Sequence, residues 1–207
     1  DYVVIAGLVR SPIGVFQSLY EPGAKRRWSM PKEDDVINCK VAAIDPFFLE
    51  ATEAVTELCI KHKKPYVTID CRHDSRLHQH AAINVVSKEC TGSDAYEGKS
   101  LEEIYALLVE NTDGLVIITS GEKDMIYGRK GQSPKRMKPF SVEVKSTLGA
   151  GDTFKAGCVY GLLKGFSDDQ IVRFASACSA IAISRFPLPL NPPTMEEVKA
   201  LLAQGTK

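Results

Sequence analysis

The chain has 207 residues, 44% of them hydrophobic, and its 26 basic and 26 acidic side chains give a net charge of zero. This balance provides no general electrostatic attraction to nucleic acid or to an anionic membrane, so we expect neither as a partner. The length and apolar content suffice for a substantial core and predict a single domain over residues 1–207.

The sequence shows no signs of export or membrane insertion. Residues 2–9 are apolar, but they are too short for a signal peptide and lack a basic leader and a cleavage site. No apolar run approaches the length of a membrane span. The six cysteines form no C-x-x-C pair and show no zinc-ligand spacing, which suits reduced thiols. We therefore expect a cytoplasmic protein.

The first part of the chain reads as two strands. Residues 1–9 are rich in β-branched residues and predict a buried strand. Residues 11–19 alternate like an exposed strand, and the turn residues at 21–24 follow them.

From Val36 onward the pattern becomes α/β. The expected elements are a strand within 36–45, an amphipathic helix over 49–62, and strands over 65–70 and 82–86. Short links between them predict right-handed parallel βαβ units, whose ligands bind beyond the carboxyl ends of the strands. Asp45, Asp70 and Arg72 are expected at that edge. An equally acceptable interpretation is that Asp70 caps a helix and pairs with Arg72.

The middle of the chain continues this alternation. A capping box at 100–103 predicts a helix through Val109, and residues 115–119 predict a buried strand. Residues 125–128 and 136–144 then predict a β-hairpin. Further on, a second capping box at 167–170 starts a helix over 171–184, and a proline-rich link at 186–193 leads to a final helix capped by residues 194–197.

The stretch 146–154, Ser-Thr-Leu-Gly-Ala-Gly-Asp-Thr-Phe, lies between a β-like run at 140–144 and an apolar helical run at 154–163. A glycine turn opening into a helix lets backbone N–H groups converge where the helix dipole favours an anion. A carboxylate beside a bound phosphate, here Asp152, indicates phosphoryl transfer with Asp152 as the base. The alternative is that Asp152 merely caps the helix.

Residues 147–154 resemble the C-terminal signature D-T-x-G-A-G-D-x-F of the PfkB (ribokinase-like) family of carbohydrate and nucleoside kinases. The resemblance implies that the amides of Gly149, Ala150 and Gly151 form an anion hole and that Asp152 is the catalytic base. Ser146 replaces the leading aspartate of the signature. A monovalent-cation site, which many members build nearby, is therefore left open.

Three further segments resemble family features and imply contacts with ATP and Mg²⁺. The turn 119–124 resembles the nucleotide loop T-x-G-x-x-G, which makes Thr119 and Gly121 candidate ATP contacts; a generic β-turn is the alternative. The family's N-x-x-E segment corresponds to residues 87–90, so Glu89 is a candidate for indirect Mg²⁺ binding or a helix-start acid. Ala177 and Ala180 are candidates for the adenine pocket, although close helix packing also explains small residues.

The family fold implied is a three-layer α/β/α sandwich with a mostly parallel central sheet and a small β lid, here residues 11–28. A family segment is expected to be absent between about residues 9 and 11, either by true deletion or because its flanks have been joined. Lid apolar residues (Ile13, Val15, Phe16 and Leu19) are compatible with a homodimer formed through the lid.

The function implied is ATP-dependent phosphorylation of a sugar hydroxyl. A nucleoside or sugar-phosphate kinase of the same fold is one alternative. A catalytically weak sensor of nucleotide or sugar is another, since Ser146, Cys90 and Asp124 depart from the family motifs, but the intact Asp152 argues against it. A Rossmann dinucleotide-binding protein is disfavoured because its phosphate would be repelled by Asp152.

Overall fold

The computed structural model describes residues 29–48, 50–92, 96–187 and 190–204. The strand predicted over residues 1–9 and the lid-like region 11–28 lie outside the described residues. So does the homodimer interface predicted at Ile13, Val15, Phe16 and Leu19.

The described elements alternate between strands and helices along the chain. The strands are β1 (Ala42–Ile44), β2 (Tyr66–Ile69), β3 (Ile83–Ser87), β4 (Leu115–Ser120), β5 (Lys123–Gly128) and β6 (Lys135–Met137). The helices are α3 (Glu33–Asn38), α4 (Glu50–Lys61), α5 (Arg76–Gln79), α6 (Leu101–Glu110), α7 (Ala150–Leu163), α8 (Asp168–Ile183) and α9 (Met195–Gln204). Two short 3₁₀ turns, η1 (Pro46–Phe48) and η2 (Cys90–Gly92), follow β1 and β3.

The strands form one sheet in the order β1-β2-β3-β4-β5-β6. The first four are parallel, with Ala43 opposite Val67 and Val85 opposite Ile117. The last two, β5 and β6, are antiparallel to their neighbours. The mostly parallel sheet that the sequence predicts is confirmed.

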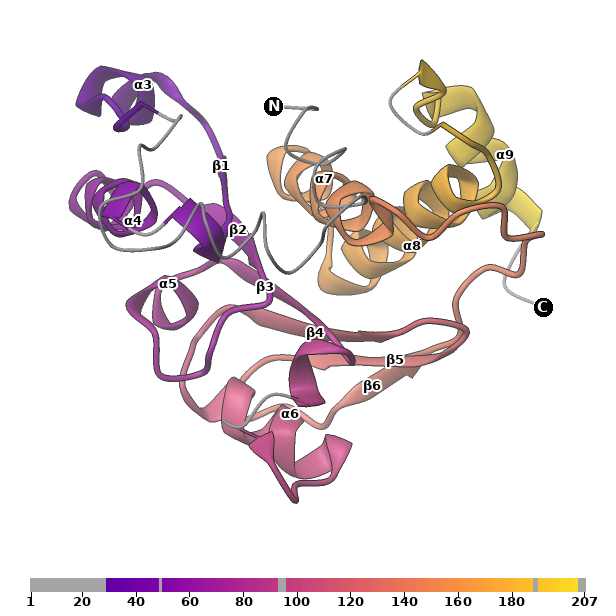
Figure 1. The fold of residues 1–207 in the computed structure, drawn as a ribbon, viewed down its shortest axis with the longest axis horizontal. Coiled ribbons are helices and arrows are strands. Elements are labelled where there is room, and N and C mark those ends of the chain that lie inside the picture. Colours follow the sequence, from indigo (N-terminus) through magenta and orange to yellow (C-terminus); the bar gives the residue numbers. More distant parts are fainter. Residues whose placement is uncertain (1–28, 49, 93–95, 188–189, 205–207) are drawn as a thin grey trace, which may run out of the picture.

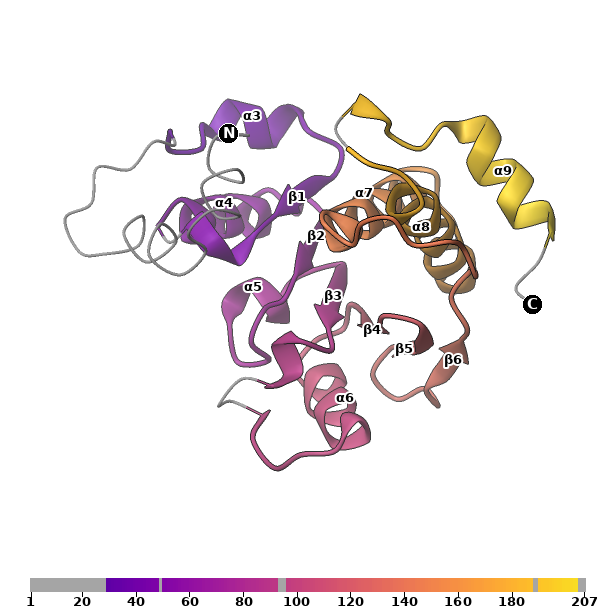
Figure 2. The same ribbon diagram turned by 45° about the vertical axis from the view of Figure 1, so that its right-hand side comes forward.

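Helices cover both faces of this sheet (Figures 1 and 2). On one face, Val67, Ile69 and the alternate residues of β3 and β4 pack against α7 and α8. On the other face, Tyr66 packs with residues of α4 and α5, and Ile118 packs with α6. Because successive side chains of a strand point to opposite faces, one strand supplies both cores. The predicted three-layer α/β/α sandwich is confirmed for the described residues.

Local capping signals determine where three helices begin. Ser100 and Ser167 each accept a hydrogen bond from the backbone three residues on, and the side chains of Glu103 and Gln170 bond back. At α9, the N–H of Glu197 donates to the Thr194 hydroxyl (3.3 Å) and that of Thr194 donates to Glu197 Oε2 (2.8 Å). All three caps are as predicted, because each depends on residues within one helical turn.

The strand predicted over residues 140–144 is wrong, and only the short β6 of the predicted 136–144 strand is present. Residues 140–144 have no regular secondary structure and no strand partner in the described sheet. Phe140 is buried against Phe174, Ala177 and Val198 of helices α8 and α9. Its alternating burial therefore arises from contact with helices, not from a β ladder.

Four of the cysteines are buried and free in the structure: Cys59, Cys71, Cys158 and Cys178. Burial raises the pKa of the Cys59 thiol to about 11 and that of Cys71 to about 12. These thiols are protonated at neutral pH and therefore poor nucleophiles. None of the described helices is both long enough and apolar enough to span a membrane.

Candidate active site

The glycine turn opens directly into helix α7, as the sequence predicts. Gly149 adopts the left-handed conformation (φ 79°) and caps α7, which begins at Ala150. The Ala150 N–H donates to the carbonyl of Thr147 at 3.1 Å, which closes the turn. Gly151 and Asp152 occupy the first helical turn, where N–H groups have no intrahelical partner. These unpaired amides form the positive end of the helix dipole and suit an anion.

Contacts from the neighbouring layers fix this turn. The Ser179 hydroxyl of α8 donates to the Ala150 carbonyl at 3.1 Å. The backbone N–H groups of Lys145 and Ser146 both donate to the carbonyl of Ile183, at 2.8 and 3.2 Å. A Cβ on Gly151 would lie 3.1 Å from Ile69 Cδ1, so the turn packs directly against the end of β2. The turn thus lies at the carboxyl edge of the sheet, where ligands of parallel α/β proteins bind.

Asp152 is accessible and has a buried cation beside it. Its side chain is 74% exposed, whereas that of Lys155 is only 9% exposed. The Lys155 ammonium lies 3.8 Å from Asp152 Oδ1 and forms an ion pair with Asp45, which follows strand β1. Lys155 is not among the residues predicted for the site, because it lies within the apolar helical run at 154–163. A lysine on the buried face of such a helix was the available signal.

Asp70 follows β2 directly, at the predicted carboxyl edge of the sheet, but it does not pair with Arg72. This residue has a positive φ (53°), and its Oδ1 accepts a hydrogen bond from the Ser87 N–H at 2.7 Å. Arg72 pairs instead with Asp74, through contacts of 3.0 and 2.7 Å, and lowers the pKa of that carboxyl to about 2. The pairing of Asp70 with Arg72 is therefore wrong. The left-handed turn directs Asp70 toward the end of β3, where it joins the two strand ends.

The predicted nucleotide loop lies between β4 and β5. Gly121 has φ 61°, so a glycine is favoured there by its backbone conformation. The carbonyl of Thr119 accepts the N–H of Lys88 at 2.9 Å, which places the loop beside the turn that carries Glu89. The Ser120 hydroxyl is buried and has no partner within the described residues. The loop and the Glu89 turn are thus neighbours, as a shared nucleotide site requires.

The two alanines predicted to contact adenine are buried, and the acidic side chains do not form a metal-binding cluster within the described residues. Ala177 is fully buried and Ala180 is 4% exposed; both pack in the cluster that contains Phe140. Packing therefore accounts for these alanines, and their contact with adenine stays a prediction. No three His, Cys, Asp or Glu side chains of the described residues gather closely enough to hold a metal ion by themselves.

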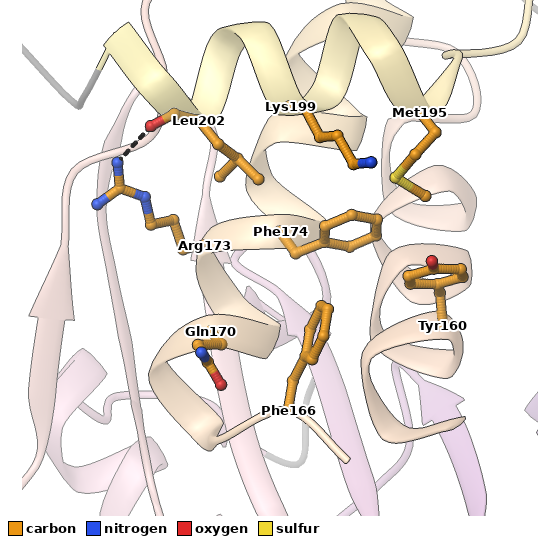
Figure 3. Close-up of a pocket in the computed structure, with 8 residues that line it drawn as sticks. All are labelled: Tyr160, Phe166, Gln170, Arg173, Phe174, Met195, Lys199 and Leu202. Atoms are coloured by element: carbon orange, nitrogen blue, oxygen red, sulfur yellow. Dashed lines mark hydrogen bonds between the residues drawn. The ribbon is translucent and has the colours of Figure 1, made fainter. Parts of the chain in front are cut away.

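A separate groove of about 310 Å³ lies among α7, α8 and α9 (Figure 3). The rings of Tyr160 and Phe174 stack there with centroids 4.9 Å apart, and Arg173 donates to the Leu202 carbonyl at 2.7 Å. Tyr160 lies about 12 Å farther along α7 than Asp152, at a rise of about 1.5 Å per residue. This groove is therefore distinct from the glycine turn.

Several known proteins are similar to this chain. It is 33% identical over 115 residues to 5-dehydro-2-deoxygluconokinase of Shouchella clausii, covering 54% of the chain and 35% of that relative. It is 32% identical over 112 residues to ribokinase of Haemophilus influenzae, covering 54% and 36%. The matched segments thus amount to about a third of these curated relatives' length.

The fold has close counterparts among solved structures. An Arabidopsis thaliana ribokinase complexed with ribose and ATP superimposes with a TM-score of 0.71, 20% identity, and coverage of 84% of this chain and 61% of that one. Residues 39–194 match the family model described as pfkB family carbohydrate kinase. That match includes β1 through α8 and the whole glycine turn, and the chain belongs to the pfkB family of carbohydrate kinases.

Proposed function

We propose that the protein transfers the γ-phosphate of ATP to a sugar hydroxyl, with Asp152 as the general base. The observation that carries this proposal is the exposed Asp152 carboxylate in the first turn of α7, directly after the left-handed Gly149. A carboxylate at a helix start that binds phosphate would repel its ligand unless it accepts a proton. Phosphoryl transfer from ATP to an alcohol requires that proton acceptor.

Backbone amides would stabilise the charge of the transferring phosphoryl group. The amides of Gly149 and Gly151 are the best candidates, because the Ala150 N–H already donates to Thr147. Such preorganised donors cost no reorganisation during the reaction. Ala150 would then act mainly by shaping the turn, which its carbonyl contact with Ser179 also supports.

Thr119 and Gly121 would contact the nucleotide, and Glu89 would orient Mg²⁺ through water. Mg²⁺ keeps several waters and is usually held by one or two carboxylates together with substrate phosphates, so a site with few protein carboxylates fits it. When bound, the ion would neutralise charge on the phosphates. Ser146 offers no carboxylate for a monovalent cation, and we assign no such site.

The charges at the site favour a neutral acceptor. Asp45, Lys155 and Asp152 together sum to one negative charge (−1 + 1 − 1), which disfavours a second phosphate on the acceptor. A neutral free sugar, such as the ribose in the Arabidopsis thaliana ribokinase complex, is therefore preferred to a sugar phosphate. A nucleoside kinase remains the second candidate, because a nucleoside also presents a neutral sugar hydroxyl.

The test is ATP consumption by the full-length protein against a panel of sugars, sugar phosphates and nucleosides, with Mg²⁺ present. Turnover on one acceptor that is lost in Asp152→Ala would establish the kinase and its substrate class. Binding of ATP without turnover on any acceptor would refute the kinase and favour a sensor.

A further inference from the structure

We propose that Lys155 is a positioning residue that holds the Asp152 carboxylate in place for proton acceptance. This inference rests on the proposed kinase function and extends it to a residue with no assigned role. Lys155 lies on α7 one turn after Asp152, and its ammonium reaches both Asp152 and Asp45.

The burial of Lys155 requires a counter-ion. An ammonium group removed from water is costly unless a carboxylate is paired with it. Asp45 supplies that carboxylate from the end of β1, far away in the sequence. The lysine therefore needs only one partner for its own stability, and Asp152 is a second carboxylate within 3.8 Å.

The ammonium is held at a fixed position. The carbonyl of Asp45 accepts the Thr52 hydroxyl at 2.6 Å, which anchors the turn after β1. The Ser179 hydroxyl anchors the first turn of α7. The cation thus lies between two elements whose backbones are tied to the rest of the fold.

Asp152, in contrast, has little else to orient it. Its side chain is 74% exposed, and within the described residues its only ion pair is the one with Lys155. An exposed carboxylate would otherwise sample several rotamers. Lys155 restricts the Asp152 carboxylate to a position near the glycine turn. An attacking hydroxyl must lose its proton there. Such orientation of a base raises the reaction rate by a large factor.

The test is a double-mutant cycle on turnover with Lys155→Met, Asp152→Ala and the two combined. Misplacement of the base should lower kcat of Lys155→Met by about 10- to 100-fold, and leave KM for ATP within about twofold since it removes no ground-state contact. Because Lys155 acts through Asp152, the combined variant should match Asp152→Ala within about threefold. Lys164→Met, at the other end of α7, is the matched control and should keep wild-type kcat.

Two results would overturn the proposal. One is an unchanged kcat in Lys155→Met; the other is a further tenfold loss in the combined variant, which would show that Lys155 acts independently of Asp152. If Lys155→Met fails to fold because Asp45 is left unpaired, Asp45→Asn/Lys155→Met removes the stranded charge. The kcat of this double variant is then compared with the kcat of Asp45→Asn alone. Equal values would refute the proposal that Lys155 positions Asp152.

A second readout separates this proposal from the kinase itself. If the wild-type protein phosphorylates no acceptor, the proposed function fails, but the Lys155–Asp152 contact is still measurable. The urea unfolding midpoints of the two single variants and the combined variant should then be non-additive. Additive midpoints would show that the two side chains do not interact and would reject the positioning role.

Discussion

Two stretches of the same helix use glycine for different purposes. At residues 149–152, Gly149 supplies a left-handed turn that exposes amides at the helix start. Two turns later, Gly157 is helical and buried, and a Cβ placed on it would lie 2.7 Å from the Cα of Ala175 in α8. The first glycine shapes the turn of the proposed anion site, whereas the second allows two helices to approach closely.

Because of this difference, we expect substitutions at the two ends of this stretch of α7 to affect turnover and folding separately. Asp152 is exposed and makes few contacts, so its loss should affect turnover and hardly affect folding. Gly157 contacts no ligand candidate, so its substitution should affect folding and hardly affect turnover per folded molecule. Substitutions on α7 and on the elements that pack around it test that separation.

Asp152→Ala should lower kcat by about 10²- to 10⁴-fold, the usual contribution of a general base. Its free energy of unfolding should change by less than about 0.5 kcal/mol, as for other exposed sites. Steady-state kinetics and urea unfolding measure the two quantities. The control is Glu196→Ala, an exposed acid in the first turn of α9, which should leave kcat unchanged. Equal losses of kcat in both variants would contradict a specific role for Asp152.

Gly157→Ala should destabilise the fold by about 1–3 kcal/mol, the usual cost of overpacking. Alanine gains about 1 kcal/mol of helix propensity over glycine. However, the new methyl would meet the backbone of Ala175, which no rotamer change can relieve, so α7 and α8 must separate. Urea unfolding measures the loss. Ala156→Leu, an exposed enlargement at the neighbouring position, should stay within about 0.5 kcal/mol; a stabilised Gly157→Ala would refute the close packing.

Much of the fold follows from local signals, and the site follows only in part. The caps at Ser100 and Ser167 and the glycine turn before Asp152 involve neighbours in sequence, so pattern analysis finds them. The alternation at residues 140–144 indicates burial correctly but cannot show whether a strand or a helix covers it. That ambiguity explains the incorrect strand.

The contacts beside the glycine turn that the sequence did not predict depend on distant partners. Lys155 reaches Asp45 across 110 positions, and Ser179 reaches Ala150 across 29. The residues next to Lys155 and Ser179 in the sequence do not predict which distant residue each one contacts. The left-handed Asp70 is similar, because its contact with Ser87 exists only once β2 and β3 are adjacent. Such contacts require the assembled sheet and helices.

Ser179→Ala should have a smaller effect on both kcat and the free energy of unfolding. Loss of its hydrogen bond to the Ala150 carbonyl should cost about 0.5–1.5 kcal/mol of unfolding free energy. Because the first turn of α7 would then be held less firmly, kcat should also fall, by less than about tenfold. Ser184→Ala removes a comparable bond to Ile181 within the last turn of α8 and should cost similar stability at unchanged kcat. An equal kcat in the two variants would argue that Ser179 does not position the turn.

The smallest effect concerns His78, on the opposite side of the sheet from α7. Its side chain is fully buried, and Nε2 contacts the Leu108 carbonyl at 2.9 Å. Burial lowers the pKa of this imidazole below its ordinary value of 6.5. In the unfolded chain the imidazole takes up a proton more readily than in the folded protein. Stability should therefore be complete above pH 6.5 and decline as the pH falls below it, by at most about 1.4 kcal/mol per pH unit.

Urea unfolding between pH 5 and 8 measures this dependence. His78→Gln retains a donor for Leu108 but cannot titrate, so its unfolding free energy should fall less steeply below pH 6.5 than that of the wild type. His80→Gln, at an exposed histidine next to α5, should keep the wild-type slope. Identical slopes of unfolding free energy against pH in all three proteins would show that His78 binds a proton equally well in the folded and unfolded states. The contact of His78 with the Leu108 carbonyl would then not depend on pH.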